Sequence, residues 1–188
     1  MGEIDVALFR WLHGSFSVGP WLAVMTVLTV IGSGWGAVVA VPFLAARRTR
    51  RFGAWLTGVF SVTAVLVFVL KALIQRQRPY LSVPNVVPLV FEAPTDYSFP
   101  SGHAAGSFAF ASFVAVVAVR SAARAHHGYL VGVLVMLLAA GVALSRVALG
   151  VHFPADVTAG ALLGSFMGAA GAHLYWRGRP QPPPRARP

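Results

Sequence analysis

Hydrophobic positions in this chain form long continuous runs instead of alternating or one-sided patterns. Five of these runs have about the 20 mostly apolar residues that a membrane-spanning helix needs. They are residues 20–46, 52–76, 102–120, 129–149 and 154–175. The glycine-rich residues 32–36 predict that the first run is kinked or divided into two shorter helices. The pattern predicts an all-α fold, a polytopic membrane helix bundle with about five transmembrane helices.

Two further patterns accompany these runs. Residues 3–16 are too polar to span a membrane, but apolar Ile4, Leu8, Trp11 and Leu12 fall there at helical spacing. We therefore expect an N-terminal interfacial helix, with a frayed terminus as the alternative and with no signal peptide. In the last run, glycines recur every four residues and predict a helix-packing stripe. They are Gly160, Gly164 and Gly168.

Composition supports a membrane protein. Charged residues make up 11% of the 188-residue chain, and its mean hydropathy is +0.72, whereas soluble proteins carry about 25% charged residues. The length allows one domain, which we expect over residues 1–176, followed by a disordered, basic, proline-rich cytoplasmic tail over 177–188. The absence of cysteine excludes disulfides and thiolate metal sites.

The basic residues gather on one side of the predicted bundle. With five spans, the 47–51 loop, the 120–128 loop and the tail share a side, and they hold four, two and four arginines but no acidic residue. The positive-inside rule makes this side cytoplasmic. We expect the protein in the inner or cytoplasmic membrane, with the lipid bilayer as partner and no nucleic acid, despite the net charge of +10.

Three polar groups lie at the ends of predicted spans, where such residues are costly and indicate function. The first is Lys71 and Arg78, followed by Pro79. Seven residues are nearly two helical turns, so both cations should face the same way about 10 Å apart. Pro79 should then end or kink the helix. The alternative is a pair of cations that extends towards the membrane interface. Arg76 lies off that face, so we expect it among headgroups or in solvent.

The second group is Pro100-Ser101-Gly102-His103, at the start of the third span. Ser101 is expected to cap the helix, and Gly102 allows close approach to the backbone. The free N–H groups of the first helical turn suit an anion. An ordinary capped helix start is the alternative, although an apolar helix has no local need for His103.

The third group contains Arg146, His152 and Asp156 at the junction of the last two spans. Gly150 should supply the turn, and Pro154 is favourable in the first turn of a helix. Asp156 should be close enough to accept a hydrogen bond from the His152 ring and so determine which ring nitrogen is free. The alternative is a structural pair that stabilises a tight turn.

All three groups fall on the same predicted extracytoplasmic face. Three cations and a helix N-terminus describe a site for a multiply charged anion such as phosphate. Two histidines and one carboxylate supply a nucleophile, its orienting partner and an acid/base. A metal ion is the rival ligand for these last three side chains, but three fixed cations would repel a divalent ion. We expect no metal and no cofactor.

The three groups resemble the signature of the type 2 phosphatidic acid phosphatase (PAP2) superfamily, over about residues 20 to 175. The matching motifs are Lys71-x6-Arg78-Pro79, Pro100-Ser101-Gly102-His103 and Ser145-Arg146-x5-His152-x3-Asp156. The chain is shorter than many bacterial members of this family, which look to have an extra N-terminal span.

This resemblance implies hydrolysis of a lipid phosphate monoester or diphosphate without a metal. It implies that His152 attacks phosphorus to form a phosphohistidine, that Asp156 holds the ring, and that His103 protonates the leaving oxygen and then activates water. The phosphate-binding residues that it implies are Lys71, Arg78, Ser101, the Gly102 N–H and Arg146.

An outward-facing site at headgroup level favours a membrane lipid phosphate as substrate. The resemblance favours an undecaprenyl-type diphosphate, with phosphatidylglycerophosphate, phosphatidic acid and a lipid A phosphate as alternatives. A non-hydrolytic lipid-phosphate transporter is an alternative of another class, which needs the cations but not both histidines and the carboxylate. The largely apolar 80–99 loop should lie over the site and shape a lipid entrance. The sequence indicates no oligomeric state.

Overall fold

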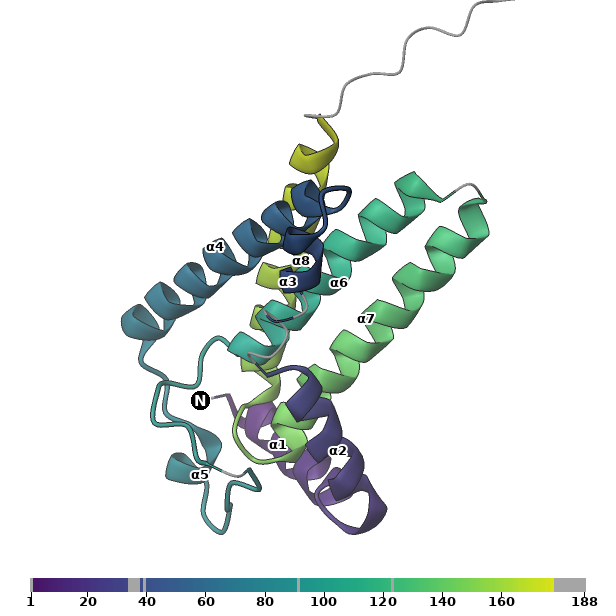
Figure 1. Ribbon diagram of the computed structural model, residues 1–188. Helices are drawn as coiled ribbons and strands as arrows, with labels where there is room; N and C mark the ends of the chain where they lie inside the picture. Colours follow the sequence, from purple (N-terminus) through teal and green to yellow (C-terminus); the bar gives the residue numbers. More distant parts are fainter. Residues whose placement is uncertain (1, 34–37, 39, 91, 123, 178–188) are drawn as a thin grey trace, which may run out of the picture.

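The fold is described by a computed structural model that covers residues 2–33, 38, 40–90, 92–122 and 124–177 (Figure 1). These residues form helices, turns and loops without strands, which confirms the predicted all-α class. The helices are α1 (Glu3–Phe16), α2 (Gly19–Ile31), α3 (Ala40–Ala45), α4 (Arg50–Ile74), α5 (Pro79–Ser82), α6 (Gly102–Ser121), α7 (Ala125–Ala148) and α8 (Pro154–Arg177). The predicted tail lies outside the described residues, except for Arg177 at the end of α8.

Four of the five predicted spans are confirmed. Helices α6, α7 and α8, and the segment Arg50–Ser82 that contains α4 and α5, are long and apolar enough to cross a membrane. The predicted first span is divided, because α2 ends at Ile31 and α3 begins at Ala40. Residues 34–36 of the glycine-rich stretch lie outside the described residues. A fifth span is possible if α1 and α2 count together, although they are bent by 108°.

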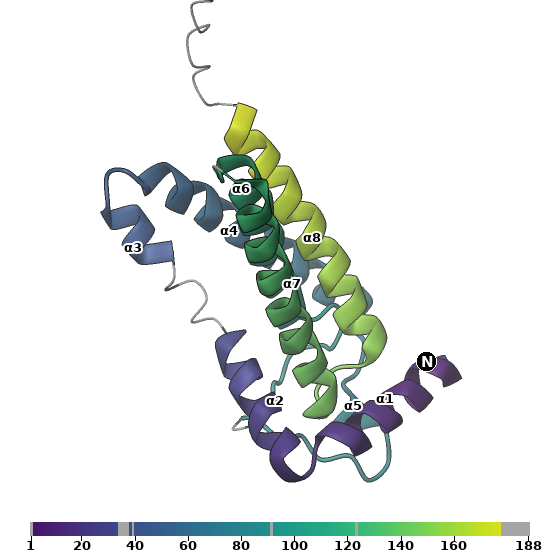
Figure 2. The same cartoon turned by 90° about the vertical axis from the view of Figure 1, so that its right-hand side faces the viewer.

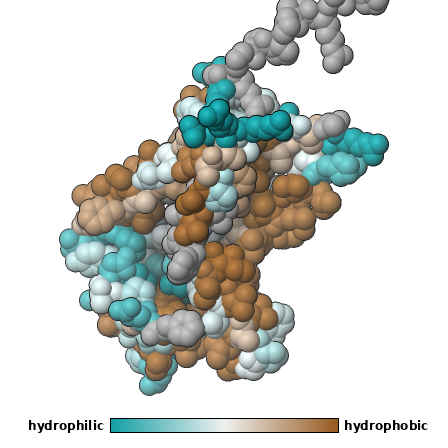
Figure 3. Space-filling model, viewed as in Figure 1, coloured by the Kyte–Doolittle hydropathy of each residue, from teal (hydrophilic) through white to brown (hydrophobic). Residues whose placement is uncertain are grey.

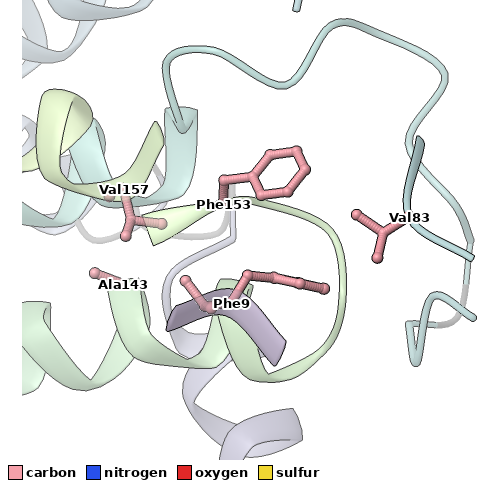
Figure 4. Close-up of a cluster of buried hydrophobic side chains, with 7 residues drawn as sticks. Phe9, Val83, Ala143, Phe153 and Val157 are labelled. Atoms are coloured by element: carbon pink, nitrogen blue, oxygen red, sulfur yellow. The ribbon is translucent and has the colours of Figure 1, made fainter. Parts of the chain in front are cut away.

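Helix α1 has two distinct faces. The ring of Phe9 is buried and packs edge-on against Phe153, with 5.4 Å between ring centroids, in the apolar cluster of Figure 4. Ile4, Leu8 and Trp11 are exposed on the other face. The segment is therefore an ordered helix and not a frayed terminus, and its exposed apolar face is one that an interfacial helix presents to lipid.

The glycine stripe of α8 sets the close packing of α6 against α8. A Cβ atom built on Gly164 would lie only 2.1 Å from the carbonyl oxygen of Ala105 on α6. Cβ atoms built on Gly160 and Gly168 would lie 2.5 Å from the carbonyl oxygen of Ser101, the cap of α6, and 2.3 Å from that of Ala109 on α6. The predicted packing stripe is therefore confirmed. This close contact brings together the first turns of the two helices, which carry the second and third polar groups.

The two ends of the bundle differ in character. One end is formed by the start of α4, the α6–α7 connection and the end of α8 (Figures 1 and 2). The opposite end is formed by α1, α5 and the α7–α8 turn. Among the described residues, the predicted cytoplasmic arginines belong to the first end and the three polar groups to the second. Figure 3 shows hydrophilic surface towards both ends and a largely hydrophobic band between them. This is the surface pattern of a multi-span membrane protein.

Candidate active site

The two cations of the first group come together, but not through helical spacing. Helix α4 ends just before Gln75, which adopts a left-handed conformation with φ of 51°. The prediction that Lys71 and Arg78 share one helix face is therefore wrong, and Pro79 begins α5 instead of ending α4. The cations meet on one carboxylate instead. Asp96 lies 3.1 Å from Lys71 Nζ and 2.5 Å from Arg78 Nη2.

Arg78 connects the first polar group to the third. Its side chain is 3% exposed, and its Nη1 donates to the carbonyl oxygen of Val151 at 2.8 Å. The same nitrogen lies 3.3 Å from Nε2 of His152, while Nε donates to the carbonyl oxygen of Asp96 at 2.8 Å. A phosphate oxygen bound by this guanidinium would therefore lie beside the imidazole nitrogen.

His152 and Asp156 are close together as expected, but a serine takes part in their interaction. His152 Nδ1 is 3.6 Å from Asp156 Oδ2, which is longer than the predicted hydrogen bond. Ser98 Oγ lies 3.3 Å from that Nδ1 and donates to Oδ2 at 2.5 Å. The N–H of Phe153 donates to the same oxygen at 2.8 Å. These contacts favour a proton on Nδ1 and leave the lone pair on Nε2, on the side of Arg78.

Burial and charge set the protonation states at this end of the bundle. Burial, together with the positive charge of Arg78, lowers the pKa of His152 to about 4, although Asp156 opposes this change. The imidazole is therefore neutral at pH 7, as a nucleophile must be. Burial would raise the pKa of Asp96, but hydrogen bonding and charge from Arg78 and Lys71 outweigh it and hold the pKa below its usual value. Asp96 is therefore an anion at neutral pH.

The second polar group forms the start of α6. Ser101 Oγ accepts a hydrogen bond from the N–H of Ala104 at 3.4 Å, which confirms the predicted cap. Ser101 is fully buried, and its own N–H donates to the carbonyl oxygen of Asp156 at 3.0 Å. Gly102 and His103 line the same cavity as Lys71. The serine therefore orders the helix start, while the next two residues form the surface that a ligand would contact.

Arg146 enters the site from α7 and is 5% exposed. Its Nη1 donates to the hydroxyl of Thr29 on α2, and its charge acts on both His103 and His152. Its Nε has no hydrogen-bond partner among the described residues. An unsatisfied buried N–H is costly, and an anion in the site would satisfy it. In the described part of the chain, no group of three or more His, Cys, Asp or Glu side chains could hold a metal ion.

The structure adds residues that the sequence analysis did not identify. Arg76 was expected among headgroups or in solvent, which is wrong, because it pairs with Asp156 at 2.6 Å and with Asp5 at 2.5 Å. Ser98 and Asp96 belong to the 80–99 loop, which confirms that this loop covers the site. Their position as polar residues just before the second motif is a signal that could have identified them.

An apolar cavity of about 670 Å³ extends from these charges into the helical bundle. Its polar end is formed by Lys71, Asp96, Gly102 and His103. Its apolar walls come mainly from α4, α6 and α7, and include Phe60, Phe110, Val135 and Leu138. From the 80–99 loop, only Asp96 is among the described residues that line it, so the helices shape the entrance more than the predicted loop does.

Fold and site together define a multi-span helical membrane protein with a neutral buried histidine, an oriented carboxylate and buried cations. Lys71 and His103 of this site line an apolar cavity between the helices. The chain belongs to the PAP2 superfamily, whose sequence profile matches residues 52–180. This confirms the family that the three motifs resembled.

Similar proteins include named phosphatases. The chain is 38% identical over 133 residues to an undecaprenyl-diphosphatase of Sulfolobus acidocaldarius, covering 71% of this chain but only 59% of that relative. It is 35% identical over 140 residues to a decaprenylphosphoryl-5-phosphoribose phosphatase of Mycobacterium tuberculosis, covering 72% of this chain and 68% of the relative. The crystal structure of a PAP2-type phosphatidylglycerolphosphate phosphatase from Bacillus subtilis is similar with a TM-score of 0.76 and 27% identity, over 99% of this chain and 90% of that chain.

Proposed function

We propose that this protein hydrolyses a phosphate monoester or diphosphate on a membrane lipid, without a metal and through a phosphohistidine. The observation that carries the proposal is the environment of His152. Its Nε2 lies 3.3 Å from Arg78 Nη1, while its Nδ1 faces Ser98 and Asp156. A neutral nucleophile is thus held beside a cation that suits the phosphate it would attack.

In the proposed reaction, His152 Nε2 attacks phosphorus and the bond from phosphorus to the leaving oxygen breaks. Asp156 and Ser98 hold the imidazole and stabilise the positive charge that it gains. His103, which lines the polar end of the apolar cavity, donates a proton to the leaving oxygen. It then takes a proton from water, which attacks the phosphohistidine, releases inorganic phosphate and regenerates His152.

The phosphoryl oxygens carry the charge that this reaction must stabilise. We assign their binding to the cations Lys71, Arg78 and Arg146, together with the N–H of Gly102 in the first turn of α6. Ser101, which the sequence resemblance also counts among the phosphate-binding residues, is the buried cap of this turn, so its proposed part is to hold the Gly102 N–H in place. Fixed cations and N–H groups that are already in place stabilise the transition state without reorganisation.

The substrate class follows from the cavity and the relatives. An apolar cavity that begins at the cations supports a substrate whose phosphate stays at the polar end while its hydrocarbon chain lies between the helices. We propose an undecaprenyl-type diphosphate, because the two relatives described above carry names that refer to polyprenyl lipids. Phosphatidylglycerophosphate is the second candidate, supported by the Bacillus subtilis structure.

We also propose an orientation and a domain assignment. The arginines at the opposite end of the bundle favour that end as cytoplasmic, which places the site and α1 on the extracytoplasmic side. Because α1 packs against Phe153 at the site, we assign residues 1–176 to one phosphatase domain.

The test is phosphate release by detergent-purified protein with EDTA present. We expect turnover of undecaprenyl diphosphate by the wild type and its loss in His152→Ala, with His127→Ala, exposed at the far end of α7, as the matched control. A reaction with labelled diphosphate, quenched with detergent at alkaline pH, should yield a labelled phosphoprotein that is stable to base and labile to acid. Binding without release would favour a transporter, and loss of activity with EDTA would favour a metal enzyme. Comparing initial rates on undecaprenyl diphosphate, phosphatidylglycerophosphate and phosphatidic acid identifies the lipid.

A further inference from the structure

A chain of ion pairs lies behind Asp156, on the side away from His152. Arg76 Nη1 contacts Asp156 Oδ1 at 2.6 Å, and Arg76 Nη2 contacts Asp5 Oδ2 at 2.5 Å. The other oxygen of Asp5 accepts a hydrogen bond from the N–H of Ala155 at 2.9 Å. Asp5 belongs to α1 and Ala155 to the first turn of α8, so the contacts form a closed loop between the N-terminal helix and the turn that carries Asp156.

These groups are shielded from solvent and held by further contacts. The side chains of Arg76, Asp5 and Asp156 are 17%, 15% and 0% exposed, so their interactions are less screened than those of surface pairs. The guanidinium of Arg76 also lies 4.2 Å from the ring centroid of Phe153. About two turns beyond Asp5 on α1, His13 Nδ1 is 2.7 Å from the carbonyl oxygen of Ala148.

The two oxygens of Asp156 therefore have different partners. Oδ2 faces Ser98, the N–H of Phe153 and His152, whereas Oδ1 faces Arg76 alone among the contacts described above. Arg76 thus restricts rotation of the carboxylate and offsets part of its negative charge. Asp5 in turn holds the guanidinium in the geometry that reaches Oδ1.

We propose that Arg76 and Asp5 are positioning residues for the reaction, which set the orientation and the effective charge of Asp156 behind the nucleophile His152. Helix α1 is then part of the catalytic apparatus as well as a helix with an exposed apolar face. This inference rests on the proposed role of His152 as the nucleophile.

Several charged or titratable groups face His152. They are Arg78 from the segment after α4, His103 from α6, Arg146 from α7 and Asp156 from α8. Arg76 and Asp5 act on it through Asp156. If Arg76 is removed, the charge of Asp156 is less compensated, so His152 binds a proton more readily. If Asp5 is removed, the cation stays beside Asp156 and this change does not occur.

The experiment uses the full chain in detergent with undecaprenyl diphosphate, from pH 4 to 9. We expect Arg76→Gln to lower kcat about 10- to 100-fold, because the imidazole is misplaced. KM should stay within about twofold of the wild-type value, because Arg76 does not contact the substrate. The acidic limb of kcat/KM should move up by about one pH unit. Arg76→Lys keeps the charge and should restore the limb but not the full kcat, because one ammonium cannot pair with both carboxylates as a guanidinium does.

The N-terminal helix is tested in the same assay. Asp5→Asn should lower kcat without moving the acidic limb of kcat/KM to higher pH. The double variant of Asp5→Asn with Arg76→Gln should be no slower than Arg76→Gln alone, because Asp5 acts through that arginine. Glu3→Gln and Arg10→Gln, both exposed on α1, are the charge-matched controls. Because all variants are assayed on the same substrate, the ionisation of the substrate affects every pH profile equally and does not contribute to the differences between variants.

An Arg76→Gln enzyme with a raised KM and an unmoved limb would overturn the inference, as would additive losses in the double variant. Should Arg76→Gln fail to fold, as judged by gel filtration, a full kcat in Arg76→Lys or in Asp5→Asn would overturn it equally. These outcomes differ from failure of the proposed function, in which the wild type releases no phosphate or His152→Ala remains active.

Discussion

The hydroxyl of Ser98 donates a 2.5 Å hydrogen bond to Oδ2 of Asp156, in a region from which solvent is excluded. The same hydroxyl oxygen lies 3.3 Å from Nδ1 of His152, so it can accept a hydrogen bond from the imidazole N–H. We therefore expect Ser98→Ala to lower kcat about tenfold, because losing a hydrogen bond to a charged group costs about 1.5 kcal/mol or more. KM should change little. Steady-state kinetics on the lipid substrate measure both, and Ser98→Thr, which restores a hydroxyl, should recover part of the rate. An unchanged kcat in Ser98→Ala would show that Asp156 is held well enough without it.

Asp96 occupies the position between Lys71 and Arg78 where a phosphate would be expected to bind. Because its pKa is held below the usual value, it remains a competing anion throughout the neutral range. Replacing it by asparagine should therefore strengthen inhibition by inorganic phosphate about two- to fivefold, the range expected for a partly exposed ion pair. The inhibition constant of phosphate in the hydrolysis assay checks this. Glu92→Gln, an exposed acid of the same loop, is the control, and weaker inhibition of Asp96→Asn would mean that the carboxylate supports the cations instead of competing for them.

The sequence predicted most of the bundle and of the candidate site, but not the contacts that orient the side chains. Hydropathy and the motifs are local signals, and they were sufficient to identify four spans and to place His103, His152 and Asp156 at one end. The end of α4 was missed because it depends on a left-handed Gln75, which the spacing of Lys71 and Arg78 does not reveal.

The remaining errors involve residues that are distant in the sequence. Ser98 is 58 positions from Asp156, and Asp5 is 71 positions from Arg76. Such pairs depend on how α1 and the 80–99 loop fold over the turn between α7 and α8, which no local pattern encodes. A polar residue such as Arg76, two positions before the motif arginine, therefore appeared free in the sequence and is paired in the fold.

The pKa of His152 leads to a specific pH dependence. Burial lowers this pKa from 6.5 to about 4, so the imidazole keeps its lone pair at all pH values above the lowered pKa and loses it as the pH falls through that value. We expect the acidic limb of kcat/KM, which reports the free enzyme, to lie well below pH 6.5. A pH–rate profile on undecaprenyl diphosphate tests this, once the ionisation of the substrate phosphate at about pH 6 has been measured separately and subtracted. A limb at 6.5 would indicate that water reaches the imidazole.

Gly164 offers a test of the packing between α6 and α8. A methyl group at this position would lie 2.1 Å from the carbonyl oxygen of Ala105, so the helices must separate. We expect Gly164→Ala to destabilise the protein by about 1–3 kcal/mol, measured as a lower thermal midpoint in detergent. Gly58→Ala on α4 is the matched control, since a Cβ there has no neighbour within 4 Å. Equal midpoints for the two variants would show that the helix pair can adjust without loss.

The apolar cavity makes a prediction about chain length that is independent of the catalytic groups. Val135 lines its wall on α7, away from the polar end formed by Lys71 and His103. A tryptophan at this position should fill space that a long hydrocarbon chain needs, whereas a substrate with a short chain keeps its phosphate at the cations without reaching the wall. We therefore expect Val135→Trp to lower kcat/KM for undecaprenyl diphosphate about tenfold more than for a diphosphate with a single isoprene unit, because each buried methylene contributes about 0.8 kcal/mol. Competition between the two substrates in one assay measures this ratio directly. Val133→Trp, on an exposed face of the same helix, controls for the added bulk. An equal loss for both substrates would place the lipid chain outside this cavity, along the surface of the bundle.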